Sequence, residues 1–405
     1  MAATSYVPTG LTIRSAEDGD WPAMSLLAAT CFGGFRPTET TAMWRTMVAS
    51  EGTVIACDGT DVVGMTLYLD LRLTVPGGAV LPAAGVSWVA VAPTHRRRGL
   101  LREMLVELHR RMASASYPVA GLEASEGGIY GRFGYGPATI EQQWSVERSK
   151  ARLHADVADP GGVRVVRAVD HRDRFEDIFE RWRLTTPGGL HSPRVLWDEV
   201  LADREVSRHG GSALFALLHA DGFALYRARG DGERKEAAVT KLVAVTPQAH
   251  IALWRALLGL DLMDTVTVET QPRDPLPYLL TDARAVRITG SEDALWLRLI
   301  DIPAALQARS YAADLSMVLD VTDATLGGGG RFSVQINEGR AVCLPTDAPA
   351  DVHTDLSVLG SLYLGTHRAS AFAVANRLRS NDAGLISQLD AAFASDVPAQ
   401  LGYGF

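Results

Sequence analysis

The sequence predicts a protein of class α/β and α+β, with two tandem units of one α/β design followed by a different unit. A chain of 405 residues is too long for one ordinary core, so several domains are expected. Short strands alternate with helices through the first two thirds, which is typical of α/β domains. One strand-to-helix junction occurs twice, about 154 residues apart, which indicates an internal duplication.

The first unit is expected over residues 1–155. Runs of apolar and β-branched residues predict its strands, and apolar residues at helical spacing predict its helices. The predicted strands are Leu11–Ser15, Thr53–Cys57, Val62–Val75, Val80–Val91, Val119–Leu122 and Ala138–Val146. The predicted helices span residues 18–33, 40–49 and 100–112, and the last of these places Leu101, Met104, Leu105 and Leu108 on one face.

The second unit, expected over residues 156–296, repeats this order. Its predicted strands are Val163–Ala168, Ala213–Leu218, Phe223–Arg227 and the run Lys241–Pro247, with helices over 173–184, 196–201 and 251–258. The third unit, over residues 297–405, changes to an α+β pattern. Its predicted strands are Leu315–Val321, Phe332–Ile336 and Arg340–Cys343, followed by helices over 354–362, 369–376 and 383–394.

The junction in the first unit, Val89–Arg102, predicts an anion site. An apolar strand ends in Thr94-His-Arg-Arg-Arg-Gly99, and an amphipathic helix begins at once. Free N–H groups at a helix start, the helix dipole and arginines together suit a diphosphate. No Lys-Ser/Thr follows the glycine, so a nucleotide triphosphatase is disfavoured. The run fits the [RQ]-x-x-G-x-[GA] turn of GNAT acetyltransferases, with Leu101 in the last position; the alternative is a solvated basic helix start.

The second copy of the junction carries Gln248–Leu253 where the first carries Thr94–Gly99. Its arginines and its glycine are gone, so any anion would bind there more weakly. We therefore interpret the first unit as active and the second as degenerate.

Composition excludes several classes of protein. Hydrophobic residues make up 47% and charged residues 21%, as in globular proteins, and the net charge of -8 argues against nucleic acid as a partner. Three scattered cysteines, Cys31, Cys57 and Cys343, indicate a reducing compartment without disulfides. The histidines form no ligand pattern, so no metal is expected. The first ten residues lack the features of a Sec signal and no apolar run is long enough to span a membrane, so a cytoplasmic location is expected, with export by other routes left open.

A second motif makes the prediction specific. In Glu123-Ala-Ser-Glu-Gly-Gly-Ile-Tyr-Gly-Arg-Phe-Gly-Tyr-Gly-Pro137 a strand ends in Ser-Glu, and a tyrosine follows two glycines. With the junction described above, this run closely resembles the enhanced intracellular survival (Eis) family of bacterial N-acetyltransferases. The resemblance covers essentially the whole chain, including Trp197-Asp-Glu199, Asp274-Pro-Leu-Pro277, Leu359–Gly365 and Ala391–Pro398.

The resemblance implies an active GNAT domain, a degenerate GNAT-like domain and a C-terminal sterol-carrier-protein-like domain, assembled as a homohexamer. It implies acetyl-CoA as the cosubstrate, without a metal. Backbone groups would hold the pantetheine arm as an added strand, guanidinium and N–H groups would hold the pyrophosphate, and a Ser-Glu pair would complete the site. Carried over by position, these residues are Val89, Ala90, Val91, Arg97, Arg98, Gly99, Leu100, Leu101, Arg102, Ser125 and Glu126.

The resemblance also implies the catalytic groups. Tyr130 would donate a proton to the departing thiolate, which the phenol pKa of roughly 10 permits; Tyr135 is the local competitor, and packing is the alternative for both. The C-terminal carboxylate of Phe405 would be the base. A carboxylate of ordinary pKa, roughly 3.5, is a weak base, so this role requires desolvation or a bridging water.

For the acceptor amine the resemblance indicates Trp21, Phe32 and Trp44 as aromatic walls, with burial in a core as the alternative. The chain departs from the family at two places. Gly33-Gly34 stands where an aspartate is expected, and Gly404 replaces an acidic residue before the terminus. Glu123 is expected to restore one negative charge. These changes bear on the range of polycationic substrates rather than on catalysis.

The leading hypothesis is acetylation of the amines of aminoglycoside antibiotics, at one or several positions, with antibiotic resistance as the consequence. A second hypothesis is acetylation of protein lysines or polyamines. A third, from another class, is a lipid or sterol carrier acting through the C-terminal domain, which would require a large apolar cavity between Ala305 and Leu389.

Overall fold

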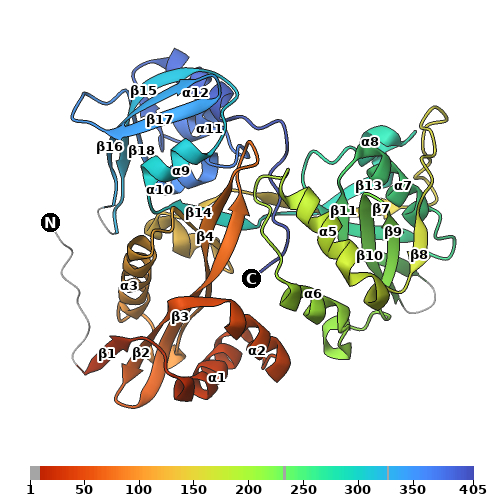
Figure 1. The fold of residues 1–405 in the computed structure, drawn as a ribbon, viewed down its shortest axis with the longest axis horizontal. Coiled ribbons are helices and arrows are strands. Elements are labelled where there is room, and N and C mark those ends of the chain that lie inside the picture. Colours follow the sequence, from red (N-terminus) through yellow and green to blue (C-terminus); the bar gives the residue numbers. More distant parts are fainter. Residues whose placement is uncertain (1–9, 231–233, 326–327) are drawn as a thin grey trace.

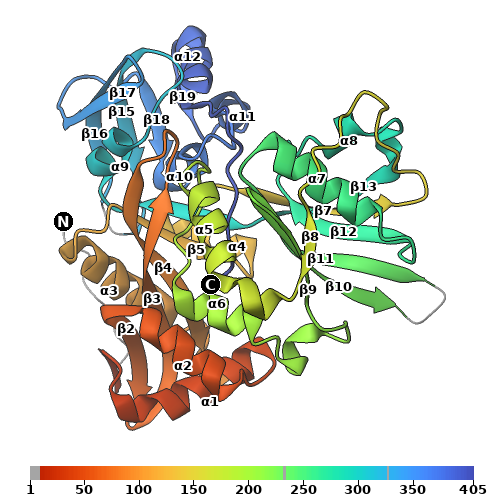
Figure 2. The same cartoon turned by 45° about the vertical axis from the view of Figure 1, so that its right-hand side comes forward.

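The structure is a computed structural model that describes residues 10–230, 234–325 and 328–405. Three sheets, each with its own helices, form three lobes (Figure 1). The first lobe is red to orange, the second green and the third blue. In both ribbon views the C-terminus lies in the middle of the molecule, between the lobes (Figure 2).

The sheet of the first lobe has the order β1-β2-β3-β4-β5-β14-β6. Its strands are β1 (Leu11–Arg14), β2 (Val48–Asp58), β3 (Asp61–Thr74), β4 (Val80–Val91), β5 (Val119–Glu123), β6 (Gly136–Pro137) and β14 (Leu295–Leu299). Its helices are α1 (Trp21–Phe32), α2 (Thr38–Met47), α3 (Leu100–Ser114) and α4 (Gly127–Tyr130). The predicted apolar face of α3 is buried at Met104, Leu105 and Leu108, while Leu101 stays partly exposed.

The sheet of the second lobe has the order β13-β7-β12-β11-β10-β9-β8. Its strands are β7 (Ile140–Glu147), β8 (Arg164–Val166), β9 (Phe215–His219), β10 (Gly222–Gly230), β11 (Lys235–Ala244), β12 (Thr265–Thr270) and β13 (Val286–Asp293). Its helices are α5 (Arg172–Arg183), α6 (Arg194–Leu201), α7 (Pro247–Leu258) and α8 (Leu276–Leu279). The succession β8 to β12 repeats that of β1 to β5, with a parallel pair at the same place, so the predicted duplication is present in the fold.

The two duplicated lobes exchange a strand. β7, predicted as the last strand of the first unit, pairs with β12 and β13 of the second sheet. In return β14 pairs with β5 and β6 of the first sheet. The placement of the 138–146 strand in the first unit was therefore wrong, because a strand's own apolar pattern does not say which of two similar sheets it completes. As limits of folding units, residues 155 and 296 stay predictions.

The third lobe is the α+β unit. Its sheet has the order β17-β16-β15-β18-β19, from β15 (Leu315–Thr322), β16 (Gly330–Asn337), β17 (Arg340–Pro345), β18 (Val352–Asp355) and β19 (Arg379–Ser380). Its helices are α9 (Ile302–Ala308), α10 (Leu356–Leu362), α11 (Ala369–Val374) and α12 (Ala383–Phe393). The helix predicted from residue 354 begins two residues later, because β18 occupies residues 352–355. Ala305 and Leu389 are both buried in the same packed core.

The third lobe docks closely on the first sheet. α10 lies so near β14 that a Cβ on Gly360 would be 2.1 Å from the carbonyl oxygen of Leu297. Arg298 of β14 bridges the lobes, since its guanidinium donates to the Phe133 carbonyl and to the Asp323 carboxylate at 2.7 and 2.6 Å. Because Arg298 and Asp323 are almost fully buried, this contact fixes how the third lobe sits.

We expect Gly360→Ala to destabilise the protein by at least about 1–3 kcal/mol, because the added methyl group meets backbone that cannot move aside. Thermal denaturation followed by circular dichroism measures the change. The control is Gly19→Ala, where a Cβ has no neighbour within 4 Å. Equal melting temperatures for the two variants would contradict this docking geometry.

Candidate functional site

The site begins where two parallel strands of the first sheet separate. β4 pairs with β5 only through residues 83–85 against 119–121, although β4 continues to Val91. A bulge in β4 bends it away, and within it Trp88 has a φ of +53°. The bulge sets the end of β4 at an angle to β5 and leaves the backbone of Val89–Val91 without a strand partner on that side in the described chain. A free strand edge of this kind suits a bound amide chain.

The turn from β4 into α3 forms the floor of the site. Arg97 and Gly99 adopt left-handed backbone conformations, with φ of +61° and +82°. No side chain caps the start of α3 within the described residues, so its first N–H groups face outward. An uncapped helix start beside arginines is an anion site with complementary charge.

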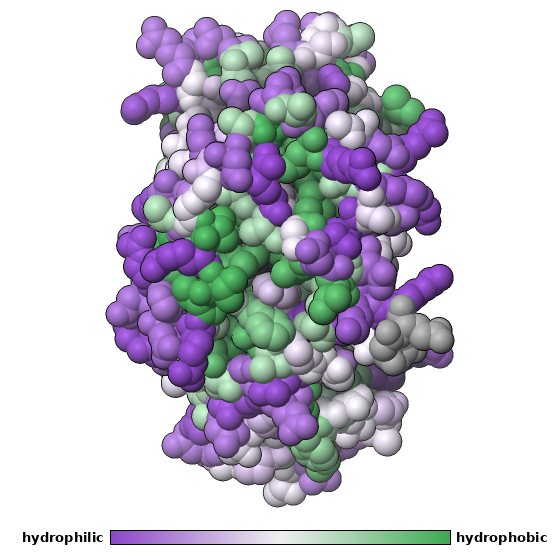
Figure 3. Space-filling model, turned by 90° about the vertical axis from the view of Figure 1, so that its right-hand side faces the viewer, coloured by the Kyte–Doolittle hydropathy of each residue, from purple (hydrophilic) through white to green (hydrophobic). Residues whose placement is uncertain are grey.

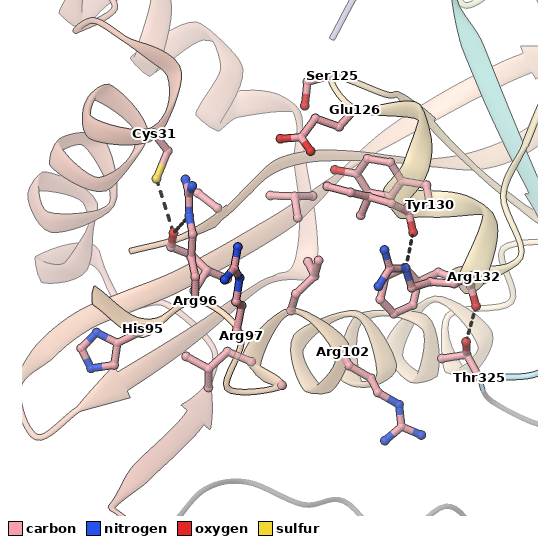
Figure 4. Close-up of a pocket in the computed structure, with 18 of the residues that line it drawn as sticks. Cys31, His95, Arg96, Arg97, Arg102, Ser125, Glu126, Tyr130, Arg132 and Thr325 are labelled. Atoms are coloured by element: carbon pink, nitrogen blue, oxygen red, sulfur yellow. Dashed lines mark hydrogen bonds between the residues drawn. The ribbon is translucent and has the colours of Figure 1, made fainter. Parts of the chain in front are cut away.

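A cavity of about 1030 Å³, called here the main cavity, occupies the space between β4, α3 and α4. Figure 4 shows Arg97 and Arg102 near the start of α3, with Ser125, Glu126 and Tyr130 across the cavity from them. Its lining residues include Val89, Ala90, Val91, Arg97, Gly99, Leu100, Leu101, Arg102, Ser125, Glu126 and Tyr130. The structure therefore brings together every predicted cofactor residue except Arg98, which is exposed and outside the lining.

Some lining residues were missed by the sequence analysis. His95, Arg96 and Arg132 add cationic or titratable groups to the wall of the main cavity. These residues lie within the two sequence motifs, Val89–Arg102 and Glu123–Pro137, so the motifs already indicated this part of the cavity wall. Thr325 comes from the third lobe, and its hydroxyl donates to the Arg132 carbonyl at 2.5 Å. No pattern near Thr325 in the sequence indicates this contact.

The equivalent helix of the second lobe does not offer the same anion site. At the start of α7 the Thr246 side chain accepts from the Ala249 N–H at 3.2 Å, and Pro247 has no N–H to offer. The N–H positions that are open to an anion at the start of α3 are thus capped or missing at the start of α7. This supports the interpretation of the second unit as degenerate.

Tyr130 stands between the main cavity and a smaller one. It lines the main cavity and also a space of about 130 Å³, called here the side chamber. Only 6% of Tyr130 is exposed, and burial, with Glu126 nearby, raises its pKa to about 12. The phenol therefore stays protonated through the physiological range. Tyr135 is fully buried, and its hydroxyl bonds to His109 Nε2 at 2.7 Å rather than facing either cavity.

The last residue of the chain lines the side chamber with Glu123, Ser125, Tyr130 and Phe32. The backbone N–H of Phe405 donates to Glu123 Oε1 at 2.6 Å. Burial raises the pKa of Glu123, and the N–H of Phe405 opposes this effect. Phe405 is thus tied to the end of β5, beside Tyr130, and is partly buried there.

Two bonds to the second lobe hold the residues just before the terminus. Lys241 Nζ donates to the Gly402 carbonyl at 2.5 Å, and the Tyr403 hydroxyl donates to the His191 carbonyl at 2.7 Å. Burial lowers the pKa of Lys241 to about 8. Residues 400–404 and Lys241 border a further cavity of about 350 Å³, called here the tail cavity.

The predicted aromatic walls separate in the structure. Phe32 lines both the main cavity and the side chamber and is 54% exposed. Trp21 packs edge-on against Trp88, with ring centroids 6.0 Å apart. Trp88 lines the side chamber, so Trp21 supports the wall of that chamber. Trp44 lies in a groove of about 600 Å³ between α2 and α6, called here the interlobe groove.

Comparisons with known proteins agree with this architecture. Two models described as acetyltransferase (GNAT) domain match residues 12–138 and 188–299, and one described as sterol carrier protein domain matches residues 302–401. N-acetyltransferase Eis of Mycobacterium tuberculosis and of Mycobacterium bovis are 56% identical to the chain over 98% of its length and 100% of theirs.

More distant relatives extend the same picture. An uncharacterised N-acetyltransferase of Streptomyces coelicolor is 35% identical over 97% of the chain and 98% of its own length. The crystal structure of Eis1 from Mycobacterium abscessus superposes with a TM-score of 0.87 at 29% identity, covering 98% of the chain and 100% of that structure. No described helix is long and apolar enough to cross a membrane, and the described residues hold no cluster of metal-binding side chains.

We expect Arg97→Ala to weaken binding of coenzyme A at least about tenfold, because a charge-assisted hydrogen bond contributes about 1.5–3 kcal/mol. Arg98→Ala is the matched control, since Arg98 is the neighbouring arginine outside the lining. Isothermal titration calorimetry measures both. Equal losses in the two variants would mean that general positive charge, rather than the main cavity, determines binding.

Proposed function

The chain belongs to the Eis family of N-acetyltransferases, and we propose that it acetylates amino groups of aminoglycoside antibiotics at one or several positions. GNAT acetyltransferases use acetyl-CoA. The observation that supports the proposal most strongly is the position of Tyr130, which borders both the main cavity and the side chamber that contains the chain terminus. A donor in one cavity and an acceptor in the other would meet at this residue.

The main cavity fits acetyl-CoA in chemistry and size. Its volume reaches the upper end of the range for small-molecule pockets, roughly 300–1,000 Å³. The uncapped start of α3 with Arg97 and Arg102 would hold the pyrophosphate, and the free edge of β4 would hold the pantetheine amides. When bound, acetyl-CoA supplies an acetyl group on a good thiolate leaving group.

The side chamber would supply the two proton transfers. The acceptor attacks as the neutral amine, and the proton that its nitrogen loses as the amide forms would pass to the carboxylate of Phe405 directly or through a water. Tyr130, protonated because burial raises its pKa to about 12, would give a proton to the departing sulfur. The Phe405 carboxylate thus takes up one proton and Tyr130 releases one. Both groups return to their starting ionisation states by exchanging protons with solvent.

The space available to the acceptor is branched. The side chamber and the interlobe groove share Arg36, and Lys241 also borders the groove. A molecule with several amines could therefore present different ones to Tyr130. Negative charge comes from Glu123 and the Phe405 carboxylate, while Arg36 and Lys241 are cationic. This mixed charge, together with Gly34 in place of an acidic residue, favours acceptors of low positive charge among the aminoglycosides.

The experiment that tests the proposal is release of free thiol with a panel of aminoglycosides, polyamines and lysine peptides, with products identified by mass spectrometry. Turnover confined to lysine peptides or polyamines would replace the proposed acceptor while keeping the chemistry. No turnover with any amine would contradict the proposal as a whole.

We also propose a homohexamer in the cytoplasm. The second and third lobes expose apolar side chains that an assembly would cover, including Val165, Phe215, Val342, Leu344 and Val374. Figure 3 shows hydrophobic residues gathered in the middle of the face on the side of the second lobe, with hydrophilic residues around them. Sedimentation velocity measures the assembly.

We expect Tyr130→Phe to lower kcat by about 10²–10⁴-fold, because the sulfur then leaves without a proton donor. The pKa of about 12 means that the phenol is still protonated at pH 10. The ratio of wild-type to variant kcat should therefore stay constant from pH 6 to 10, and a ratio that falls as pH rises would indicate a phenol of lower pKa. Affinity for acetyl-CoA should not change, which calorimetry checks.

We expect two alanines added after Phe405 to lower kcat by about 10²-fold or more, because the carboxylate moves out of the side chamber. The KM for acetyl-CoA should stay within about twofold, since the main cavity is unaltered. The control carries the same two alanines at the N-terminus. Full activity of the C-terminally extended enzyme would exclude the terminal carboxylate as the base.

A further inference from the structure

We infer that Glu123 is a positioning residue for the catalytic terminus, and that it acts by holding the backbone N–H of Phe405 rather than by binding the acceptor. The inference rests on the proposed use of the terminal carboxylate. The sequence alone suggested that Glu123 restores a negative charge for a cationic acceptor; the geometry gives its carboxylate a different partner.

Glu123 is held rigidly at the rim of the site. It is the last residue of β5 and pairs with Leu295 of β14, so its backbone is fixed by the exchanged strand. Its side chain lines the side chamber with Tyr130 and Phe405, and its Oε1 accepts the Phe405 N–H at 2.6 Å. A short hydrogen bond from a paired strand to the nitrogen of the final residue restricts the position of the carboxylate two bonds further on.

Gly404 is fitted to this contact. A Cβ on Gly404 would lie 2.9 Å from Glu123 Oε1 and 3.0 Å from Oε2, so the carboxylate end of Glu123 would have to shift, and its bond to Phe405 with it. An acidic residue at 404 would moreover bring two carboxylates together. Gly404, which departs from the family pattern, therefore leaves room for the Glu123 carboxylate. Together the two residues allow the terminus to approach β5 closely.

The bonds from the second lobe do not replace Glu123. Lys241 and Tyr403 fix residues 402 and 403, and among the described residues the bond to Glu123 is the one that holds the backbone N–H of the last residue. Rotation about the backbone of Gly404 would otherwise move the carboxylate, because glycine has the widest conformational freedom. Glu123 removes that freedom.

The charges around Glu123 come from several elements. Glu141 of β7 and Glu269 of β12 add negative charge, as does the Phe405 carboxylate, and Lys241 of β11 adds a positive one. Burial, with Glu269 and Glu123 nearby, raises the pKa of Glu141 to about 7. In this partly desolvated setting a hydrogen bond is stronger than in water, which suits a tether.

The test compares Glu123→Ala, which removes the acceptor of the hydrogen bond, with Glu123→Gln, whose amide oxygen still accepts it. The first readout is release of Phe405 by carboxypeptidase A from the folded protein, which needs no turnover. We expect release about tenfold faster from the Ala variant, the equivalent of one lost hydrogen bond, and within about threefold of wild type from the Gln variant. The control is Glu141→Gln, which removes a nearby charge and leaves the tether.

The second readout is the steady-state kinetics with acetyl-CoA and kanamycin. Glu123→Ala should lower kcat about tenfold with the KM for acetyl-CoA unchanged, and Glu123→Gln should keep kcat within about threefold. If both variants instead raise the KM for kanamycin equally, with Phe405 released at the wild-type rate, Glu123 binds the acceptor and the inference is wrong.

If Glu123→Ala does not fold, Gly404→Ala takes its place, with Glu123 intact. It should accelerate release of Phe405, because its Cβ would meet the two carboxylate oxygens of Glu123 and displace them from the Phe405 N–H. Release at the wild-type rate from Gly404→Ala would overturn the inference. If kanamycin is no substrate, the proposed function fails on the kinetic readout while the release assay still decides the role of Glu123.

Discussion

The pairing of β14 with β5 and β6 fixes the relative position of all three lobes. β14 leaves the second lobe, completes the first sheet and leads directly into α9 of the third lobe. α10 and the buried Arg298–Asp323 contact then hold the third lobe against this strand, and the final residues leave from there. They pass between the first two lobes and end in the side chamber, beside Tyr130. The position of Phe405 beside Tyr130 thus depends on the strand exchange.

The two copies of the strand-to-helix junction differ in how well they can bind an anion. Both copies place a helix start at the end of a strand, so both present the positive end of a helix dipole. In α7 the Thr246 side chain caps the helix, whereas Gly99 leaves α3 uncapped. The second lobe nevertheless takes part in the site, because Lys241, at the position where the repeated run begins, holds the Gly402 carbonyl. Its contribution is to position the chain terminus.

The charge pattern around the terminus differs from what the family resemblance implies. Two acidic positions are glycine here, and one of them, Gly404, is the residue that lets the terminus approach Glu123. In this chain the carboxylate next to Phe405 comes from Glu123, at the end of β5. A carboxylate engaged with the backbone is less available to a cationic acceptor, and Arg36 adds positive charge nearby.

The sequence by itself determined the fold class, the duplication, the family and the two motifs that supply most of the main-cavity wall, because these depend on local patterns: periodicity, a basic turn and a Ser-Glu strand end. It assigned the 138–146 strand to the wrong sheet and did not foresee Thr325 in the cavity wall, because nothing local specifies a partner that is distant in the chain. Only the tertiary structure decided that Glu123 contacts Phe405, 282 positions away. That contact depends on the docking of the third lobe, which no short segment encodes.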